Sequence, residues 1–136
     1  MAALGGLAQT PSPLYETRTE HDPNGIGKFY LGREIARVMG HEGVGWLERP
    51  EREREERTDL LIPALKLKRG EAVADIGCGS GYYTRRLAGA VGTSGAVYAV
   101  DFQPEMLDYL TNKLAGEHVR NVKPVLGTLT DPKLPK

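Results

Sequence analysis

The second half of the chain alternates between apolar stretches and stretches with helical periodicity. The apolar stretches are residues 72–76, 96–100 and 122–126. The first two are nearly continuous in apolar character, as expected for parallel strands covered on both faces. Residues 81–91 and 104–115 place apolar side chains at helical spacing, and Pro104 suits the start of the second helix. This order predicts an α/β fold with a doubly wound parallel sheet.

The first half of the chain shows a different pattern. Residues 1–27 are rich in turn-forming residues and predict a disordered leader without a core. From residue 28 to 39, Leu31, Ile35 and Val38 recur at helical spacing. The pattern therefore predicts that a helix occupies residues 28–39 and opens a helical leader over residues 28–69.

A run of charges, "ERPEREREERTD" from residue 48 to 59, lies inside this leader. Glu48 and Arg52, and Glu53 and Arg57, are four residues apart, the spacing of ion pairs along one helix. The signs nearly cancel, so we interpret the run as a solvated helix face and not a nucleic-acid site. The helix is expected to continue to about residue 65, with a kink or break at Pro63.

Composition narrows the class of protein further. Eighteen basic residues balance 18 acidic ones, which gives no signal for nucleic acid or an anionic membrane. A single cysteine excludes an internal disulfide framework, and the three histidines show no metal-ligand spacing. No apolar run approaches the roughly 18 residues of a membrane span. The chain length suits one domain.

The N-terminal residues indicate whether the protein stays in the cytoplasm or is exported. Residues 1–8 are small and apolar, like the end of a signal peptide, but the stretch has no basic n-region and its apolar part is short. We expect a cytoplasmic protein. The alternative is an exported one, with residues 1–8 as a signal remnant.

A glycine turn (residues 77–81) follows the apolar stretch 72–76, which contains Asp75. Glycines at alternate positions let a ligand approach the backbone without meeting a Cβ atom. The carboxyl ends of the strands are where open α/β sheets bind ligands. Asp101 ends the next strand, twenty residues after Gly81, where a carboxylate can accept both hydroxyls of a ribose. The pattern predicts a site for a nucleoside-type cofactor.

Two cofactors fit such a turn. A nicotinamide dinucleotide turn reads G-x-G-x-x-G, and here Tyr82 stands at the final glycine. A dinucleotide has no need of an acid before the first glycine, whereas Asp75 suits a cationic ligand such as an α-amino group. The spacing therefore favours S-adenosyl-L-methionine, with a nicotinamide-dependent oxidoreductase as an alternative.

The segment "VADIGCGSGYYTRRLA" and the later "VYAVDFQPEML" resemble motifs I and II of class I S-adenosylmethionine-dependent methyltransferases. The resemblance covers about residues 50 to 130. Within the leader, "GREIARVMGHEGVGWLERPEREREE" is similar to that of a bacterial methyltransferase group. The resemblance implies a Rossmann-like fold, S-adenosyl-L-methionine as cofactor, and methyl transfer to an unidentified acceptor, which can be a small molecule.

The resemblance also implies roles for single residues. Asp75, Gly77, Gly79 and Gly81 match the motif that holds the methionine part of the cofactor. Cys78 belongs to the same turn as a small packing residue, and with no second cysteine, thiolate-based methyl transfer is not expected.

A second group of residues matches the positions that contact the adenosine part of the cofactor. Asp101 matches the acid on the ribose hydroxyls, and Phe102 the residue that packs against adenine. Thr128 and Leu129 lie where the family contacts the adenine edge, although many members have an aspartate there.

Class I methyltransferase sheets usually have seven strands, ordered 3-2-1-4-5-7-6. This chain is expected to be the N-terminal portion of such a domain, with residues 70–136 truncated after about three strands and an apolar sheet edge exposed. A catalytically silent cofactor-binding or interaction fragment is therefore a second alternative. No residue stands out as catalytic. The candidates for a lid over the cofactor are Tyr30, Arg33, Glu34, His41 and Trp46.

Overall fold

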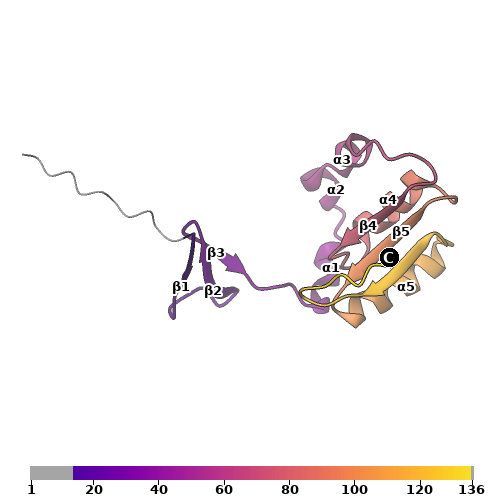
Figure 1. The fold of residues 1–136 in the computed structure, drawn as a ribbon. Helices are drawn as coiled ribbons and strands as arrows, with labels where there is room; N and C mark the ends of the chain where they lie inside the picture. The colour runs from indigo at the N-terminus through magenta and orange to yellow at the C-terminus, as the bar shows by residue number, and fades with distance from the viewer. Residues whose placement is uncertain (1–13, 136) are drawn as a thin grey trace, which may run out of the picture. The chain divides into compact units, whose positions relative to one another are not determined.

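The computed structural model describes residues 14–135 of the chain. The chain divides into two compact units, Met1–Val38 and Met39–Lys136, and each has its own three-stranded sheet (Figure 1). The boundary falls inside the predicted leader of residues 28–69. The predicted signal remnant of residues 1–8 lies outside the described residues.

The first unit is an antiparallel sheet. Its strands, in the order β1-β2-β3, are β1 (Tyr15–Thr17), β2 (Gly25–Tyr30) and β3 (Arg33–Ala36). The prediction of a helix over residues 28–39 is therefore wrong. The expectation of a disordered leader over residues 1–27 is also wrong for the part that forms β1 and the start of β2.

A two-residue turn explains why a hairpin forms here. Leu31 and Gly32 have φ angles of 49° and 79°, and two successive left-handed residues are typical of the tight turns that join antiparallel strands. β2 alternates strictly between buried and exposed residues. Leu31 and Val38, which have helical spacing, are 69% and 59% exposed. Their side chains therefore pack against no core.

The second unit contains the predicted parallel sheet. Its strands are β4 (Ala72–Ile76), β5 (Ala96–Asp101) and β6 (Val122–Leu126), and they lie in that order. Both pairs of neighbouring strands are parallel, with Asp75 opposite Ala99. The three predicted strands are confirmed. Asp75 and Asp101 lie at the same end of adjacent strands, as expected.

Two helices connect these strands, α4 (Tyr82–Val91) and α5 (Pro104–Gly116), and both were predicted. Pro104 occupies the first turn of α5. The buried residues form two core clusters. These are Cys78, Ala99, Leu107, Leu110 and Leu114, and Leu87, Ala88, Val91 and Val97.

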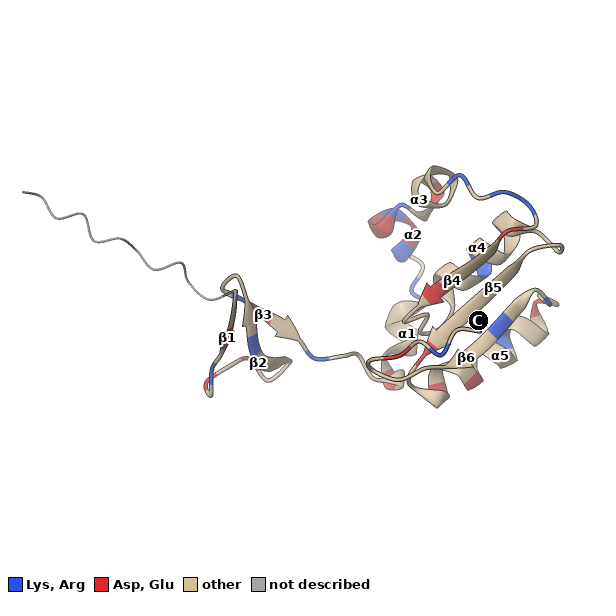
Figure 2. Cartoon of the chain, in the orientation of Figure 1, with Lys and Arg blue, Asp and Glu red and all other residues tan. Residues whose placement is uncertain are grey.

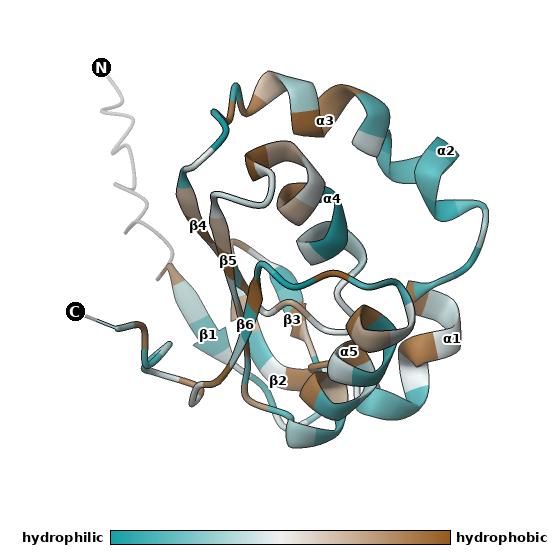
Figure 3. Ribbon diagram, turned by 90° about the vertical axis from the view of Figure 1, so that its right-hand side faces the viewer, coloured by the Kyte–Doolittle hydropathy of each residue, from teal (hydrophilic) through white to brown (hydrophobic). Residues whose placement is uncertain are grey.

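Val97 and Ala99 point to one face of the sheet and meet both helices, so α4 and α5 cover the same face. The ribbon shows α4 and α5 on the same side of β4 and β5 (Figure 3). Residues of the other face of β4 are exposed, and Ile76 is 60% exposed although it is hydrophobic. The expectation that β4 is covered on both faces does not hold within residues 14–135. Two successive crossovers in the same direction place both helices on one side.

The leader helices (residues 41–64) precede this sheet in the second unit. They are a 3₁₀ turn, η1 (His41–Gly43), and three short helices, α1 (Val44–Leu47), α2 (Arg52–Glu56) and α3 (Thr58–Ala64). The predicted continuous helix breaks at Arg57, which has left-handed φ and ψ angles of 50° and 53°. Pro63 lies within α3 and does not end it. Within residues 14–135, no helix has the length and hydropathy to cross a membrane.

Candidate cofactor site

The glycine turn (residues 77–81) joins the end of β4 to the start of α4. The backbone N–H groups of Gly77 and Cys78 both donate to the carbonyl oxygen of Val100, at 2.8 and 2.9 Å. Gly77, Gly79 and Gly81 all have φ angles in the left-handed region. The turn therefore depends on backbone conformations that glycine adopts without strain.

Two of these glycines serve different purposes. A Cβ atom on Gly77 would meet no atom within 4 Å, so this position presents open backbone. A Cβ atom on Gly81 would stand 2.2 Å from Cδ1 of Leu110 in α5. Gly81 is therefore required by the packing of α5 against the turn, whereas Gly77 leaves room for a ligand.

The carboxylate of Asp101 links the turn to the end of β5. Its Oδ2 accepts a hydrogen bond from the backbone N–H of Gly79, and its Oδ1 accepts one from that of Gln103, both at 2.9 Å. Asp101 is 6% exposed. Each carboxylate oxygen retains a further lone pair, so the same group that braces the turn can accept ligand hydroxyls.

Asp75 lies beneath the start of α4. Its Oδ2 accepts a hydrogen bond of 2.6 Å from the hydroxyl of Thr84, which is fully buried. Burial raises the pKa of the Asp75 carboxyl above its ordinary value, and the bond from Thr84 only partly opposes this. Thr84 was not predicted as a site residue. Its signal is a hydroxyl three residues after Gly81, in the first turn of α4.

Cys78 packs into the core beneath the turn, with Leu107 and Leu110. Burial raises the pKa of its thiol to about 12. The thiol is therefore protonated at neutral pH and acts as a small apolar side chain, as expected.

A hollow of about 360 Å³ lies at the carboxyl end of β4 and β5. It is lined by Ile76, Gly77, Val100, Asp101, Phe102, Thr128, Leu129, Thr130, Asp131 and Pro132. The predicted residues Gly77, Asp101, Phe102, Thr128 and Leu129 therefore come together in one cavity. Thr130 and Asp131 were not predicted, and they join the cavity because the hydroxyl of Thr128 accepts from their backbone N–H groups.

A larger hollow of about 750 Å³ lies where β5 and β6 begin. Its charged and titratable lining residues are all basic, namely Arg69, Arg85, His118, Arg120 and Lys123. None of the predicted site residues lines it. Within residues 14–135, no cluster of three or more histidine, cysteine or acidic side chains has the arrangement of a metal site.

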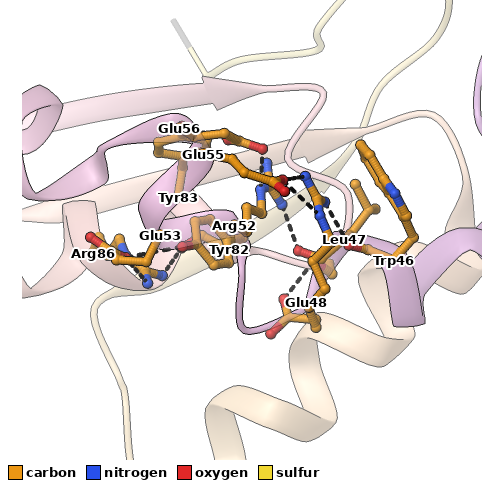
Figure 4. A network of polar contacts seen from close by, with 12 residues as sticks. Trp46, Leu47, Glu48, Arg52, Glu53, Glu55, Glu56, Tyr82, Tyr83 and Arg86 are labelled. Atoms are coloured by element: carbon orange, nitrogen blue, oxygen red, sulfur yellow. Dashed lines mark hydrogen bonds and ion pairs between the residues drawn. The ribbon is translucent and has the colours of Figure 1, made fainter.

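The charge run of the leader helices is not a solvated face, and this prediction is wrong for several of its members. The Arg52 guanidinium lies 4.1 Å from the ring centre of Tyr82 and donates to Glu56 at 2.6 Å (Figure 4). Glu56 also accepts from the hydroxyl of Tyr83 at 2.7 Å. Burial and this hydrogen bond raise the pKa of Tyr83 to about 12.

The predicted pairs along one helix are replaced by pairs between elements. Glu53 accepts from Tyr82 at 3.0 Å and from Arg86 at 2.7 Å, both in α4. Arg57 pairs with Asp59 in place of Glu53. Figure 2 shows both charge signs side by side on α2, the pattern that suggested solvation. The difference arises because α2 faces the aromatic and basic start of α4.

The predicted lid residues have other contacts. In the first unit, the rings of Tyr30 and Tyr15 are 5.1 Å apart, and Glu34 accepts from the backbone N–H of Gly27 at 2.8 Å. Arg33 begins β3. The role of these residues as a lid stays a prediction.

The other two lid candidates lie in the second unit. Trp46 is 54% exposed, with the Arg49 guanidinium 3.7 Å from its ring centre. His41 begins η1 and lies 3.8 Å from the carboxylate of Glu42. The lid role of these two residues also stays a prediction.

Comparison with known proteins shows what the second unit is similar to. Residues 73–136 match the family model described as a methyltransferase domain. A protein-L-isoaspartate O-methyltransferase of Methanothrix thermoacetophila is 35% identical over 68 residues, which are 50% of this chain and 32% of that protein. A demethylmenaquinone methyltransferase of Lactobacillus johnsonii is 41% identical over 56 residues, 41% of this chain and 23% of that protein.

A solved structure agrees with this match. A SAM-dependent methyltransferase from Aquifex aeolicus superposes with a TM-score of 0.59 at 31% identity, over 63% of this chain and 46% of that one. The chain spans about a third or less of the curated relatives it matches. The resemblance to class I S-adenosylmethionine-dependent methyltransferases is confirmed, and residues 73–136 have the Rossmann-like fold of that class.

Proposed function

We propose that the chain is the cofactor-binding part of an S-adenosylmethionine-dependent methyltransferase. The observation that carries this proposal is the hollow at the end of β4 and β5. It combines the open backbone of Gly77 with Asp101, Phe102 and the segment 128–132. These residues come from three separate places in the sequence, and the cofactor motif accounts for their meeting in one cavity.

The residues fit the chemistry of the cofactor. When bound, it supplies a methyl group already activated by a sulfonium, so the protein chiefly has to position the reactants. We assign the ribose hydroxyls to Asp101 and one face of the adenine to Phe102, which is 38% exposed beside the hollow. Thr128 and Leu129 border the same hollow and are assigned to the adenine edge.

Asp75 is assigned to the α-amino group of the methionine part. Burial raises the pKa of this carboxyl, and the hydrogen bonds of Thr84 and the charge of Arg52 offset the rise only in part. An ammonium group placed beside it would lower the pKa again and stabilise the charged pair. The other four residues of β4 are hydrophobic, so an acid is unusual at this position of the strand.

The proposal covers the cofactor half of the reaction. The relatives are named after different acceptors, isoaspartate in proteins and demethylmenaquinone. We therefore propose an acceptor that is a small molecule or a protein group, and we assign no catalytic base. We also propose the cytoplasm as the compartment, because residues 1–8 contain no basic segment of the kind that opens a signal peptide.

Calorimetric titration of the whole chain with S-adenosylhomocysteine and, separately, with NADH tests the proposed function. We expect binding of S-adenosylhomocysteine and no heat with NADH beyond dilution. Binding of NADH alone would overturn the proposal in favour of an oxidoreductase. Transfer of tritium from methyl-labelled S-adenosylmethionine to components of a cell extract would then separate an active enzyme from a silent binding fragment.

A further inference from the structure

Glu48 lies at the end of α1 and contacts three elements at once. Its Oε1 accepts a hydrogen bond of 2.6 Å from the hydroxyl of Ser80 in the glycine turn. Its Oε2 pairs with Arg85 of α4 at 2.7 Å and also with Lys113 of α5. The side chain of Glu48 is 15% exposed. One carboxylate therefore joins the leader helices to the turn and to both helices that pack beside it.

The turn residue in this contact is itself deeply buried. Ser80 is 1% exposed, and Glu48 accepts from its hydroxyl. The residue before Glu48 lies beside the same turn, because Cδ1 of Leu47 is 3.3 Å from the place where a Cβ of Gly79 would stand. Two adjacent residues of the leader helices thus lie next to two adjacent residues of the turn.

The charge of Glu48 is stabilised where it stands. Burial by itself would raise the pKa of this carboxyl. Hydrogen bonds from Lys113 and Ser80, together with the charge of Arg85, hold the pKa below its ordinary value. The group is therefore ionised at neutral pH, and its bonds to Arg85 and Lys113 are charge-assisted.

We propose that Glu48 is a positioning residue for the cofactor: by holding Ser80, it keeps the glycine turn in the conformation that binds S-adenosylmethionine. This inference rests on the proposed function. The turn contains three glycines with left-handed φ angles, and glycine has access to more backbone conformations than any other residue. If only a fraction of the molecules has the binding conformation, the apparent affinity falls by that fraction. Glu48 would keep that fraction high.

The experiment compares Ser80→Ala, Glu48→Gln and Glu48→Ala with the parent chain. Ser80→Ala removes only the hydroxyl that touches Glu48, and Glu48→Gln keeps an acceptor for Ser80 but loses the charge. The matched control is Glu55→Ala, because Glu55 pairs with Arg49 inside the leader. Two quantities are measured, the dissociation constant for S-adenosylhomocysteine and the hydrogen–deuterium exchange of the amides of residues 77–83 in the free protein.

We expect the dissociation constant to rise about 10-fold in Glu48→Ala and about 3- to 10-fold in Ser80→Ala, with a smaller rise in Glu48→Gln. Exchange of the turn amides should become faster in the same order. Glu55→Ala should match the parent in both measurements. Melting temperatures are recorded as well, so that an affinity loss can be separated from general destabilisation.

Binding and exchange that are unchanged in both Glu48→Ala and Ser80→Ala would overturn the inference. A change in Glu55→Ala as large as in Glu48→Ala would also overturn it, because the effect would then be one of general stability. Failure of the parent chain to bind S-adenosylhomocysteine would overturn the proposed function itself. In that case the exchange measurement still decides whether Glu48 holds the turn.

Discussion

The glycine turn and the leader helices are neighbours in the second unit, but they are held by different forces. The turn takes its shape from three glycines with left-handed φ angles and from backbone bonds to Val100, and Glu48 supports it only through Ser80. The leader helices have no fully buried apolar side chain, and their contacts to the rest of the unit include charged and aromatic groups such as Arg52 on Tyr82. A binding turn can be recognised from local spacing, whereas the segment that supports it cannot.

The largest expected effect concerns Gly81. Gly81→Ala forces a left-handed alanine and places its Cβ against Leu110, so we expect a loss of about 2–4 kcal/mol in the free energy of unfolding. Gly77→Ala should cost only about 1–2 kcal/mol, because the space beside it is open. Urea denaturation measures both. As a control, Gly89→Ala in α4 has open space and should stabilise by about 0.5–1 kcal/mol.

Equal losses for Gly81→Ala and Gly77→Ala would contradict the distinction between a packing glycine and an open one. The affinity for S-adenosylhomocysteine sharpens the test. Gly77→Ala should weaken binding more than its small effect on stability suggests, since its Cβ enters the space assigned to the ligand.

The second prediction concerns Asp101, which both braces the turn and is assigned to the ribose. Asp101→Ala should weaken binding of S-adenosylhomocysteine by about 2–3 kcal/mol, or roughly 30- to 150-fold, through loss of two charge-assisted bonds. It should also destabilise the fold by about 1–3 kcal/mol, because the partly buried N–H of Gly79 loses its acceptor.

Asp101→Asn separates these two roles. One amide oxygen can still accept, but the amide nitrogen must face either the N–H of Gly79 or that of Gln103. We expect stability between those of the parent and Asp101→Ala, measured by thermal unfolding. Tight binding by Asp101→Ala would show that Asp101 does not hold the ribose.

The third prediction concerns the support given by the leader helices. Tyr82→Phe removes the hydroxyl that donates to Glu53 but keeps the ring beneath Arg52, so we expect a loss of about 0.5–1.5 kcal/mol in unfolding free energy. The control is Tyr98→Phe on the open face of the sheet, where the hydroxyl has only a 3.4 Å contact to Lys123. If the two variants lose the same stability, the contact between Glu53 and α4 is no stronger than a surface one.

The smallest expected effect is the pH dependence that comes from Glu48. Its folded-state pKa lies below the ordinary value of 4.5, so its contribution to stability is present above pH 4.5 and is lost as the pH falls through the folded-state value. The group is partly solvated, and the contribution should stay below about 1 kcal/mol. Glu48→Gln should lose less stability than the parent between pH 5 and about pH 3, measured by urea midpoints. Parallel curves for the two proteins would contradict this.

Sequence pattern alone was enough for the elements that depend on neighbouring residues. The apolar run before Gly77 forms a strand, and Pro104 starts a helix, because backbone conformation and burial of one face are local properties. The end of each parallel strand follows from this order, which is why Asp75 and Asp101 could be placed at one edge of the sheet. That these and the other predicted residues hold the cofactor stays a prediction.

Tertiary structure decided what depends on distant partners. The segment with helical spacing forms a hairpin that turns at Leu31 and Gly32. A helix is not favoured there because Leu31 and Val38 are exposed and pack against no core. Glu48 was expected to pair with Arg52, four residues away, but it pairs with Arg85 and Lys113, which come close only after α4 and α5 have packed on the sheet. The attraction between two opposite charges grows as the distance between them falls. Packing of the helices on the sheet sets that distance, and sequence spacing does not contain it.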